Sequence, residues 1–289
     1  MTVPGLGQTI SRGFDADTVI SVDEVARQAR ALARGVPLDQ LDGLAGPDQA
    51  LQIDDLCAGY GQMEILHGFN LRVGRGQSLC LIGPNGAGKS TVLHSIFGFT
   101  TIYSGSILSN HGSGRADVTH LSANEKLRSA GIAYVLQDKS VFPHMTVEEN
   151  LWMGAFLMER AAEAKLAAER VFDQYPRLAA RRKYPAKVLS GGERRLLEIS
   201  RALVMDPKVL LIDEPSIGLE PRFIDMVFEI LGDLQHKGGK TIVMVEQNAK
   251  KGLEFANIGY VLVSGELAIA GKARDLLADP DVGRLFLGG

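Results

Sequence analysis

The chain has 289 residues, of which 45% are hydrophobic and 22% are charged. This composition suits one or two folded domains and excludes a collagen-like or intrinsically disordered protein. The net charge of −3, with both signs interspersed, offers no basic field, so we expect no nucleic-acid partner. The two cysteines, Cys57 and Cys80, lack a metal-binding spacing. Since no 18-residue apolar run or signal-peptide pattern occurs, we expect an intracellular protein.

The composition changes near residue 48. Residues 1–48 are rich in Gly, Asp and Ala and contain one short amphipathic pattern, SVDEVARQARALARG at 21–35. Because the apolar face of this pattern is small, we interpret the segment as a weakly ordered N-terminal extension. The alternative is a docking helix. Residues 49–289 are predicted to form the main domain.

Strand-like and helix-like segments alternate along the main domain. Helical periodicity occurs at 90–97, in the alanine-rich stretch that ends at Pro176, and between the apolar runs at 209–213 and 241–246. The chain closes with a predicted hairpin around the two-residue turn Ser264-Gly265. This alternation predicts an α/β fold with a parallel sheet. The apolar runs expected as strands are 51–58, 69–73, 78–83, 132–137, 209–213 and 241–246.

A phosphate-binding loop is the strongest single motif. Residues 83–90, GPNGAGKS, match the P-loop pattern between a predicted strand and a predicted helix. In such a loop, backbone N–H groups surround the phosphate chain, Lys89 reaches the β and γ phosphates, and the Ser90 hydroxyl ligates Mg²⁺. The predicted nucleotide-binding residues are Gly83, Pro84, Asn85, Gly86, Ala87, Gly88, Lys89, Ser90 and Thr91.

Two adjacent carboxylates end the apolar strand VLLIDE at 209–214. Open α/β sheets bind ligands at the carboxyl ends of their strands. Since successive strand residues point to opposite faces, we assign different tasks to the two. Asp213 is predicted to hold Mg²⁺ through water, and Glu214 to polarise the attacking water as a general base.

Two further residues are candidates on weaker grounds. Gln137 ends its own predicted strand, so its amide oxygen could contact Mg²⁺ or the attacking water, although polar strand ends are common. Tyr60 lies between two glycines in AGYGQ, where its ring could stack on adenine. The alternative for Tyr60 is an ordinary turn residue.

A second anion-binding helix start occurs in LSGGERRLLEIS at 189–200. Ser190, Gly191 and Gly192 at a helix N-terminus offer N–H groups, a hydroxyl and a dipole that favour an anion. The alternative is an ordinary helix that begins with glycine. Two such sites in one chain require an explanation.

In order along the chain, Tyr60, GPNGAGKST, Gln137, LSGGE, VLLIDEP, SIGLE and TIVMVEQN resemble the ATP-binding subunits of ABC transporters. The resemblance spans residues 51–263. It implies a P-loop NTPase (RecA-like) core, an antiparallel β subdomain and an inserted α-helical subdomain at about 138–190. It also implies ATP and Mg²⁺ as cofactors, and ATP hydrolysis coupled to transport.

The resemblance also accounts for the second site. In that family, the signature motif of one subunit, here Ser190 to Glu193, caps the γ-phosphate of ATP on the P-loop of a second, head-to-tail subunit. Residues 216–220 resemble the loop that crosses between the subunits. Gln247 stands where most members have a switch histidine, and Glu193 stands where many have glutamine. A glutamine amide can donate to a phosphate oxygen but cannot take up a proton.

The stretches VFPHMTVEENLWMG and LSGGERRLLEISRALVMDPKVLLIDEPSIGLEP resemble one branch of the family, the second ATPase of branched-chain amino-acid importers and their urea and amide relatives. The implied partners are membrane-spanning permease subunits, a second ABC ATPase and, indirectly, an extracytoplasmic solute-binding protein. The implied location is the cytoplasmic face of the plasma membrane. The solute remains open.

The segment after Gln137 is a candidate partner surface. In the family this region meets a cytoplasmic helix of the membrane subunit. For Met153 and Leu157 we expect core packing instead. The surface candidates are Phe142, Pro143, His144, Met145 and Trp152.

Two other classes share parts of this pattern. Soluble ABC ATPases of DNA repair or chromosome organisation carry long coiled-coil or zinc-bearing insertions, and this sequence shows neither the heptads nor the cysteines. A regulator or assembly factor that binds ATP without hydrolysing it would not need Glu214. An assembly role for an active ATPase stays open.

Overall fold

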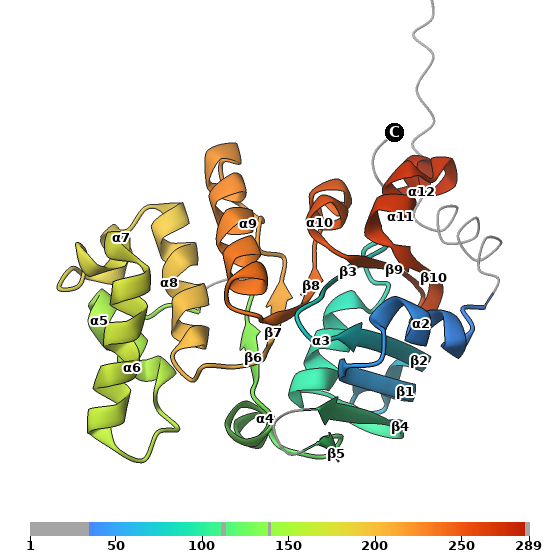
Figure 1. Ribbon diagram of the computed structural model, residues 1–289, viewed down its shortest axis with the longest axis horizontal. Coiled ribbons are helices and arrows are strands. Elements are labelled where there is room, and N and C mark those ends of the chain that lie inside the picture. The colour runs from blue at the N-terminus through green and yellow to red at the C-terminus, as the bar shows by residue number, and fades with distance from the viewer. Residues whose placement is uncertain (1–34, 111–113, 138–139, 287–289) are drawn as a thin grey trace, which may run out of the picture.

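The computed structural model describes residues 35–110, 114–137 and 140–286. The amphipathic pattern at 21–35 lies outside these residues except for Gly35. The described part begins with helix α2 (Leu38–Ala45), which packs against the β strands that follow (Figure 1). Leu41 of α2 is fully buried. The last residues of the expected N-terminal extension thus pack on the main domain.

A six-stranded sheet forms the centre of the molecule. Its order is β10-β9-β3-β8-β7-β6, and all pairs are parallel except the antiparallel hairpin of β9 and β10. The predicted parallel α/β sheet is confirmed. Its strands are β3 (Ser78–Ile82), β6 (Ile132–Val135), β7 (Val209–Asp213), β8 (Thr241–Val245), β9 (Ile258–Val263) and β10 (Glu266–Lys272).

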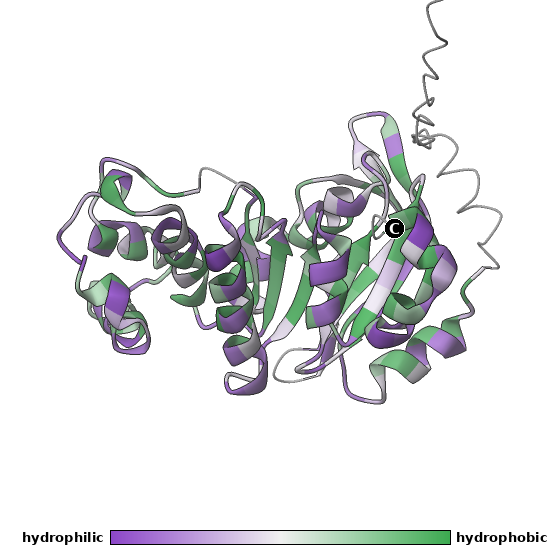
Figure 2. Ribbon diagram, turned by 90° about the horizontal axis from the view of Figure 1, so that it is seen from above, coloured by the Kyte–Doolittle hydropathy of each residue, from purple (hydrophilic) through white to green (hydrophobic). Residues whose placement is uncertain are grey.

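Both faces of this sheet are covered, which explains why its strands are apolar without alternation. In β3, Leu79 and Leu81 face one hydrophobic cluster, while Cys80 and Ile82 face another. Helix α3 (Lys89–Phe97) lies in the first cluster, between the two sheets. Figure 2 shows the apolar strands enclosed by helices with polar outer faces. The second cluster is covered by α9 (Pro221–His236), α10 (Ala249–Phe255), α11 (Ala273–Ala278) and α12 (Pro280–Phe286).

A separate four-stranded antiparallel sheet lies on the side of the first cluster, with the order β2-β1-β4-β5. Strand β4 (Thr101–Asn110) escapes sequence analysis because most of its residues are exposed or half-buried, so it lacks an apolar run. The other strands are β1 (Gln49–Tyr60), β2 (Met63–Gly74) and β5 (Arg115–Asp117).

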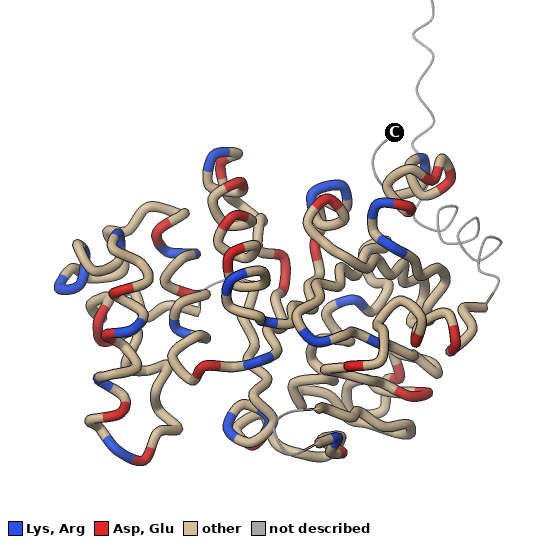
Figure 3. Tube along the Cα trace, viewed as in Figure 1, with Lys and Arg blue, Asp and Glu red and all other residues tan. Residues whose placement is uncertain are grey.

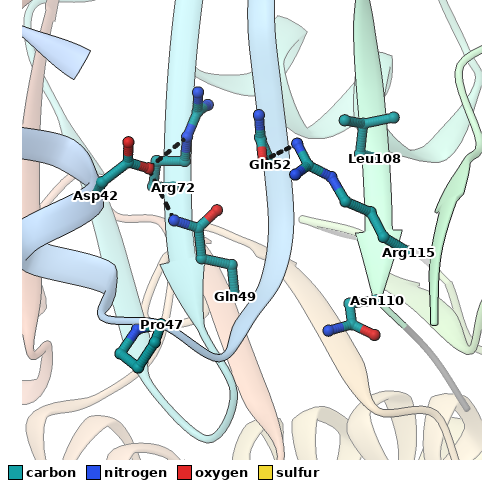
Figure 4. A pocket seen from close by; sticks show the side chains of 8 residues that line it. All are labelled: Asp42, Pro47, Gln49, Gln52, Arg72, Leu108, Asn110 and Arg115. Atoms are coloured by element: carbon teal, nitrogen blue, oxygen red, sulfur yellow. Dashed lines mark hydrogen bonds and ion pairs between the residues drawn. The ribbon is translucent and has the colours of Figure 1, made fainter. Parts of the chain in front are cut away.

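A depression beside α2 is lined by residues of this antiparallel sheet (Figure 4). Its arginines already have partners. Arg72, which is 4% exposed, pairs with Asp42 of α2 at 3.1 Å and donates to the Ile53 carbonyl at 2.6 Å. Arg115 donates to the side chain of Gln52. Arg72 therefore joins α2 to β1, and the depression is the junction of these elements.

The chain between β6 and β7 forms a helical part at one end of the molecule (Figure 1). This part has its own hydrophobic cluster, whose residues lie between Val147 and Val204. Helix α8 (Gly191–Leu203) contributes to the cluster and therefore packs against the other helices of this part. Figure 3 shows charges of both signs spread over this part and over the sheets. The helices here are α5 (Val147–Gly154), α6 (Ala161–Gln174), α7 (Pro176–Ala179), the short 3₁₀ turn η1 (Ala186–Val188) and α8 (Gly191–Leu203); α4 (Ala123–Ser129) precedes β6. The antiparallel sheet, central sheet and helical part match the architecture that the resemblance implies.

Candidate ATP-binding site

The P-loop connects β3 to helix α3. The backbone angle φ is 144° at Gly83 and 98° at Gly88, values that residues other than glycine rarely adopt. A Cβ atom at Gly83 would lie 2.2 Å from the carbonyl oxygen of Leu262. The predicted nucleotide-binding residues 83–91 therefore form one continuous loop and helix start, where backbone N–H groups can receive phosphate oxygens.

Lys89 is held inside this loop. Its ammonium group donates hydrogen bonds of 2.9 Å to the carbonyl oxygens of Gly83 and Pro84. Burial lowers the pKa of Lys89, and the nearby carboxylates of Glu214 and Asp213 oppose that shift. A phosphate chain in the loop would add negative charge and favour the charged ammonium. Lys89 is thus in place to exchange loop carbonyls for phosphate oxygens.

The turn of the C-terminal hairpin supports the P-loop. Ser264 and Gly265 have φ angles of 51° and 82°, as the favoured two-residue turn requires. The Gly265 N–H donates to the Ala87 carbonyl at 2.9 Å, and a Cβ at Gly265 would lie 1.9 Å from the Ile65 carbonyl oxygen. The sequence predicts the turn, but nothing in the local pattern predicts its contact with the loop.

Ser90 and Asp213 meet at the carboxyl end of the central sheet. The Ser90 hydroxyl donates to Asp213 Oδ1 at 3.2 Å, and the Tyr134 hydroxyl donates to Asp213 Oδ2 at 2.9 Å. Within the described residues, no group of three or more His, Cys, Asp or Glu could hold a metal ion. Mg²⁺ in nucleotide sites uses one or two carboxylates together with phosphate oxygens and water. One hydroxyl beside one carboxylate fits this chemistry.

Glu214 follows β7 in a left-handed backbone conformation, with φ of 43°. Such a conformation costs on the order of 1 kcal/mol and is common at functional sites. The Glu214 N–H donates to the Val245 carbonyl at 2.9 Å, which anchors the residue to β8. Burial raises the pKa of Glu214, and the charge of Asp213 adds to the rise, while Lys89 opposes it. A carboxylate with a raised pKa is better suited to accept a proton.

Gln137 lies exposed just after β6 and contacts Glu214. Its amide nitrogen donates to Glu214 Oε2 at 2.7 Å. A contact of the Gln137 amide oxygen with Mg²⁺ or the attacking water stays a prediction. The backbone at Gln137 is fixed by Arg195 of α8, which the sequence analysis missed. Arg195 is 4% exposed and donates to the carbonyls of Leu136 at 2.8 Å and Asp213 at 3.2 Å.

Gln247 lies exposed after β8, beside the buried carboxylate of Glu246. Glu246 Oε1 accepts hydrogen bonds from the Ser216 hydroxyl at 2.7 Å and from the Asn248 N–H at 2.9 Å. This carboxylate therefore joins the loop at 216–220 to the loop that carries Gln247. Glu246 was not among the predicted site residues, although a glutamate that ends an apolar run was an available signal.

Tyr60 ends β1 beside helix α3. Its hydroxyl is hydrogen-bonded to His94 Nδ1 at 2.5 Å, and the two rings meet edge to face. The side chain is 44% exposed, so one part of the ring stays accessible. Stacking on adenine remains a prediction for Tyr60, and the contact with His94 orients the ring.

The signature segment begins helix α8 with a complete capping box. Ser190 is the N-cap: its hydroxyl accepts the Glu193 N–H at 3.3 Å, and Glu193 Oε2 accepts the Ser190 N–H at 2.9 Å. The hydrogen bond from the Ser190 backbone lowers the pKa of Glu193. Ser190 and Gly191 are exposed, so this helix start can still receive an anion.

The two signature glycines differ in their surroundings. A Cβ at Gly191 would meet only a Leu219 side-chain atom, at 3.5 Å. A Cβ at Gly192 would lie 2.4 Å from the Phe223 ring of helix α9. Gly192 is therefore required for helix packing, whereas Gly191 leaves an open face. Figure 1 shows α8 and the P-loop helix α3 on opposite sides of β6 and β7.

A groove of about 230 Å³ runs along the edge of β6 beside α5. It is partly apolar: Phe156 is 79% exposed and Met153 is 38% exposed. The expectation that Met153 is a core residue is wrong, because α5 turns this side chain toward the groove. Trp152 and Phe142, expected at this surface, are also exposed. The lining includes Phe97, Tyr134, Met153, Phe156, Leu157 and Arg201.

A P-loop beside a hydroxyl group, a carboxylate and a glutamate that can polarise water defines a nucleotide-binding protein of the P-loop class. The family model described as ABC transporter matches residues 66–217. The chain is 38% identical over 233 residues to the probable branched-chain amino acid transport ATP-binding protein LivF of Archaeoglobus fulgidus, covering 81% of this chain and 96% of that one. It is 38% identical over 239 residues to the high-affinity branched-chain amino acid transport ATP-binding protein BraG of Pseudomonas aeruginosa, covering 83% and 100%.

Solved structures agree with the sequence relatives. A nucleotide-free ATP-binding cassette from an ABC transporter matches with a TM-score of 0.72 at 26% identity, covering 82% of this chain and 98% of that one. A cassette in its ADP conformation matches with a TM-score of 0.71 at 27% identity, covering 83% and 98%. The chain belongs to the ABC transporter family as an ATP-binding subunit, and it is an ATPase. Among the residues described, no helix has the length and apolar character needed to cross a membrane.

Proposed function

We propose that this chain is the ATP-hydrolysing motor of an importer for branched-chain or other hydrophobic amino acids. The carrying observation is the complete set of hydrolytic groups at one P-loop: Ser90 beside Asp213, and Glu214 beside Gln137. The names of the relatives at 38% identity support the importer assignment. A urea or amide importer of the same branch is the alternative outcome of the tests.

Hydrolysis at this site needs a held phosphate chain and an activated water. Lys89 and the loop N–H groups bind and orient the phosphates. Mg²⁺, when bound at Ser90 and Asp213, neutralises phosphate charge. Glu214 accepts a proton from the attacking water, for which its raised pKa is favourable. Gln137 keeps the Glu214 carboxylate in place through the 2.7 Å hydrogen bond.

The working unit is a head-to-tail pair of such subunits. Ser190 and Gly191 are exposed at the start of α8, a helix that lies apart from α3, which follows the P-loop (Figure 1). An anion-binding helix start at this position suits the γ-phosphate of ATP bound to a partner. The partner is a second copy or a related ABC ATPase. Gln247 is assigned to the γ-phosphate of the ATP that this chain's own P-loop holds.

The groove beside α5 is the proposed contact with a permease. Its exposed Met153 and Phe156 would cover a short apolar helix at the cytoplasmic end of a membrane subunit. The protein would then act at the cytoplasmic face of the plasma membrane. An extracytoplasmic solute-binding protein would deliver the solute without touching this chain.

Reconstitution tests this proposal. The full chain would be co-expressed and purified with its candidate permease and second ATPase. The complex would be placed in liposomes, and the solute-binding protein would be included in the assay. We expect leucine-loaded binding protein to raise ATP hydrolysis several-fold above the basal rate. Stimulation by urea or acetamide instead would move the assignment to the other importers of the branch. Hydrolysis by a chain that assembles with no permease would overturn the transport role.

A further inference from the structure

Tyr134 of β6 contacts the proposed metal side of the site from outside the recognised motifs. Its hydroxyl donates to Asp213 Oδ2 at 2.9 Å, while Ser90 donates to Oδ1 at 3.2 Å. Each carboxylate oxygen of Asp213 therefore accepts one hydroxyl group. Because the two donors lie on α3 and β6, they fix the rotation of the carboxylate plane.

The tyrosine ring belongs to an aromatic cluster next to the groove. Its centroid lies 5.6 Å from that of Phe97, 5.7 Å from His94 and 6.0 Å from Phe99. Tyr134 and Phe97 are both among the residues that line the groove beside α5. The same side chain thus has its ring in a cluster that borders the groove and its hydroxyl on Asp213.

The chemistry of the hydroxyl suits a fixed donor. At neutral pH a tyrosine hydroxyl keeps its proton, and the Tyr134 hydroxyl lies 2.9 Å from Asp213 Oδ2. The phenol therefore stays protonated and donates to the carboxylate. A hydrogen bond to a charged acceptor is stronger than one between neutral groups, so it holds Asp213 firmly.

We propose that Tyr134 is a positioning residue that orients Asp213 for the metal and links this carboxylate to the groove beside α5. The inference rests on the proposed magnesium role of Asp213. Groups that hold a metal ligand in place commonly control metal affinity. Packing changes at the groove would then reach the nucleotide site through one side chain.

Metal binding tests the first part. Mn²⁺ would be titrated into the full chain with a non-hydrolysable ATP analogue, and free Mn²⁺ followed by electron paramagnetic resonance. We expect Tyr134→Phe to weaken Mn²⁺ binding about tenfold, with thermal unfolding and metal-free nucleotide binding close to those of the parent chain. The control is Tyr260→Phe, which removes the hydroxyl of a fully buried tyrosine bonded to the Arg72 backbone and should leave Mn²⁺ affinity unchanged. Equal affinity in Tyr134→Phe and the parent would overturn the proposal.

Asp213→Asn separates the two possible failures. If this variant keeps the parent Mn²⁺ affinity, the metal role of Asp213 is wrong and the inference falls with it. If Asp213→Asn loses Mn²⁺ while Tyr134→Phe does not, only the role of Tyr134 is wrong.

A double-mutant cycle tests the link to the groove. Phe97→Leu changes the packing of the Tyr134 ring and leaves the hydroxyl present. We expect Phe97→Leu to alter Mn²⁺ affinity by about threefold in the parent chain and to have no further effect in Tyr134→Phe. If the two substitutions act independently, their effects on Mn²⁺ affinity will multiply in the double variant. That result would show that the Tyr134 ring does not transmit packing changes at the groove to Asp213.

Discussion

The amide nitrogen of Gln137 lies 2.7 Å from the Glu214 carboxylate oxygen that accepts its hydrogen bond, although 77 positions separate the two residues. Gln137 is connected by backbone to the helical part, and Glu214 directly follows the central strand β7. Any movement of the helical part would therefore change the support of the proposed general base. This contact makes the roles of the two residues separable by experiment.

Replacing Glu214 with glutamine should slow hydrolysis strongly while sparing ATP binding. Glutamine keeps the shape and an oxygen that can accept from Gln137, but it cannot take a proton from water. We expect the hydrolysis rate to fall by about 10²- to 10⁴-fold, with the nucleotide dissociation constant nearly unchanged. Single-turnover hydrolysis and equilibrium binding of a fluorescent ATP analogue measure the two effects. Normal turnover in this variant would remove Glu214 from the role of base.

Replacing Gln247 with alanine should slow hydrolysis without changing its pH profile near neutrality. The glutamine amide donates to phosphate oxygen but does not titrate, so no histidine at this position contributes a proton. We expect a loss of about 10²-fold, as for removal of one donor to developing charge. The measurement is the hydrolysis rate between pH 6 and 8 in both proteins. An unchanged rate in Gln247→Ala would contradict the assigned phosphate contact.

The two signature glycines should respond differently to substitution. Gly191→Leu places a side chain on an open face, so folding and ATP binding by one chain should persist while hydrolysis by the pair is lost. Gly192→Ala would put its Cβ 2.4 Å from the Phe223 ring, so the free energy of unfolding should fall by about 1 to 3 kcal/mol. Denaturant unfolding and hydrolysis assays on both variants test this distinction. A stable, inactive Gly192→Ala would assign it the role expected here for Gly191.

The sequence predicts those parts of the site that depend on short-range pattern. The P-loop, the strand before Asp213 and the start of α8 are local motifs whose geometry follows from a strand end or a helix N-terminus. Tyr134, Arg195 and Glu246 were missed because their contacts join residues 79, 18 and 30 positions apart. Each looks ordinary in its own segment, and only the packing of β6, α8 and β8 around the site gives it a role.

The same distinction applies to the fold. The central strands are recognisable because both of their faces are buried, so each reads as an apolar run. Strand β4 has an exposed face and few apolar residues, and its pairing with β1 decides its conformation. Met153 was misassigned because helical spacing gives a face but not the element that covers it. At α5 the covering element is absent from the described residues, so the side chain borders an open groove.

Lys126 of α4 is a fully buried lysine whose protonation should affect stability. Its ammonium donates to the Ser95 carbonyl at 3.2 Å near the end of α3, and burial lowers its pKa to about 8. In the unfolded chain the pKa is near 10.5, so between these values the unfolded state binds more protons. The free energy of unfolding therefore gains a contribution that rises with pH across this window, up to about 3 kcal/mol.

Denaturant unfolding at pH 7.5 and 10 measures that contribution by comparison with Lys126→Met. The parent chain should gain stability relative to the variant as the pH rises, because methionine carries no titrating group. The control is Lys187→Met, which removes an exposed lysine and should keep the parent's pH dependence. If Lys126→Met and the parent change in parallel between the two pH values, then the buried ammonium does not titrate in this window, and its charge is compensated by the carbonyls of Ser95 and Thr119.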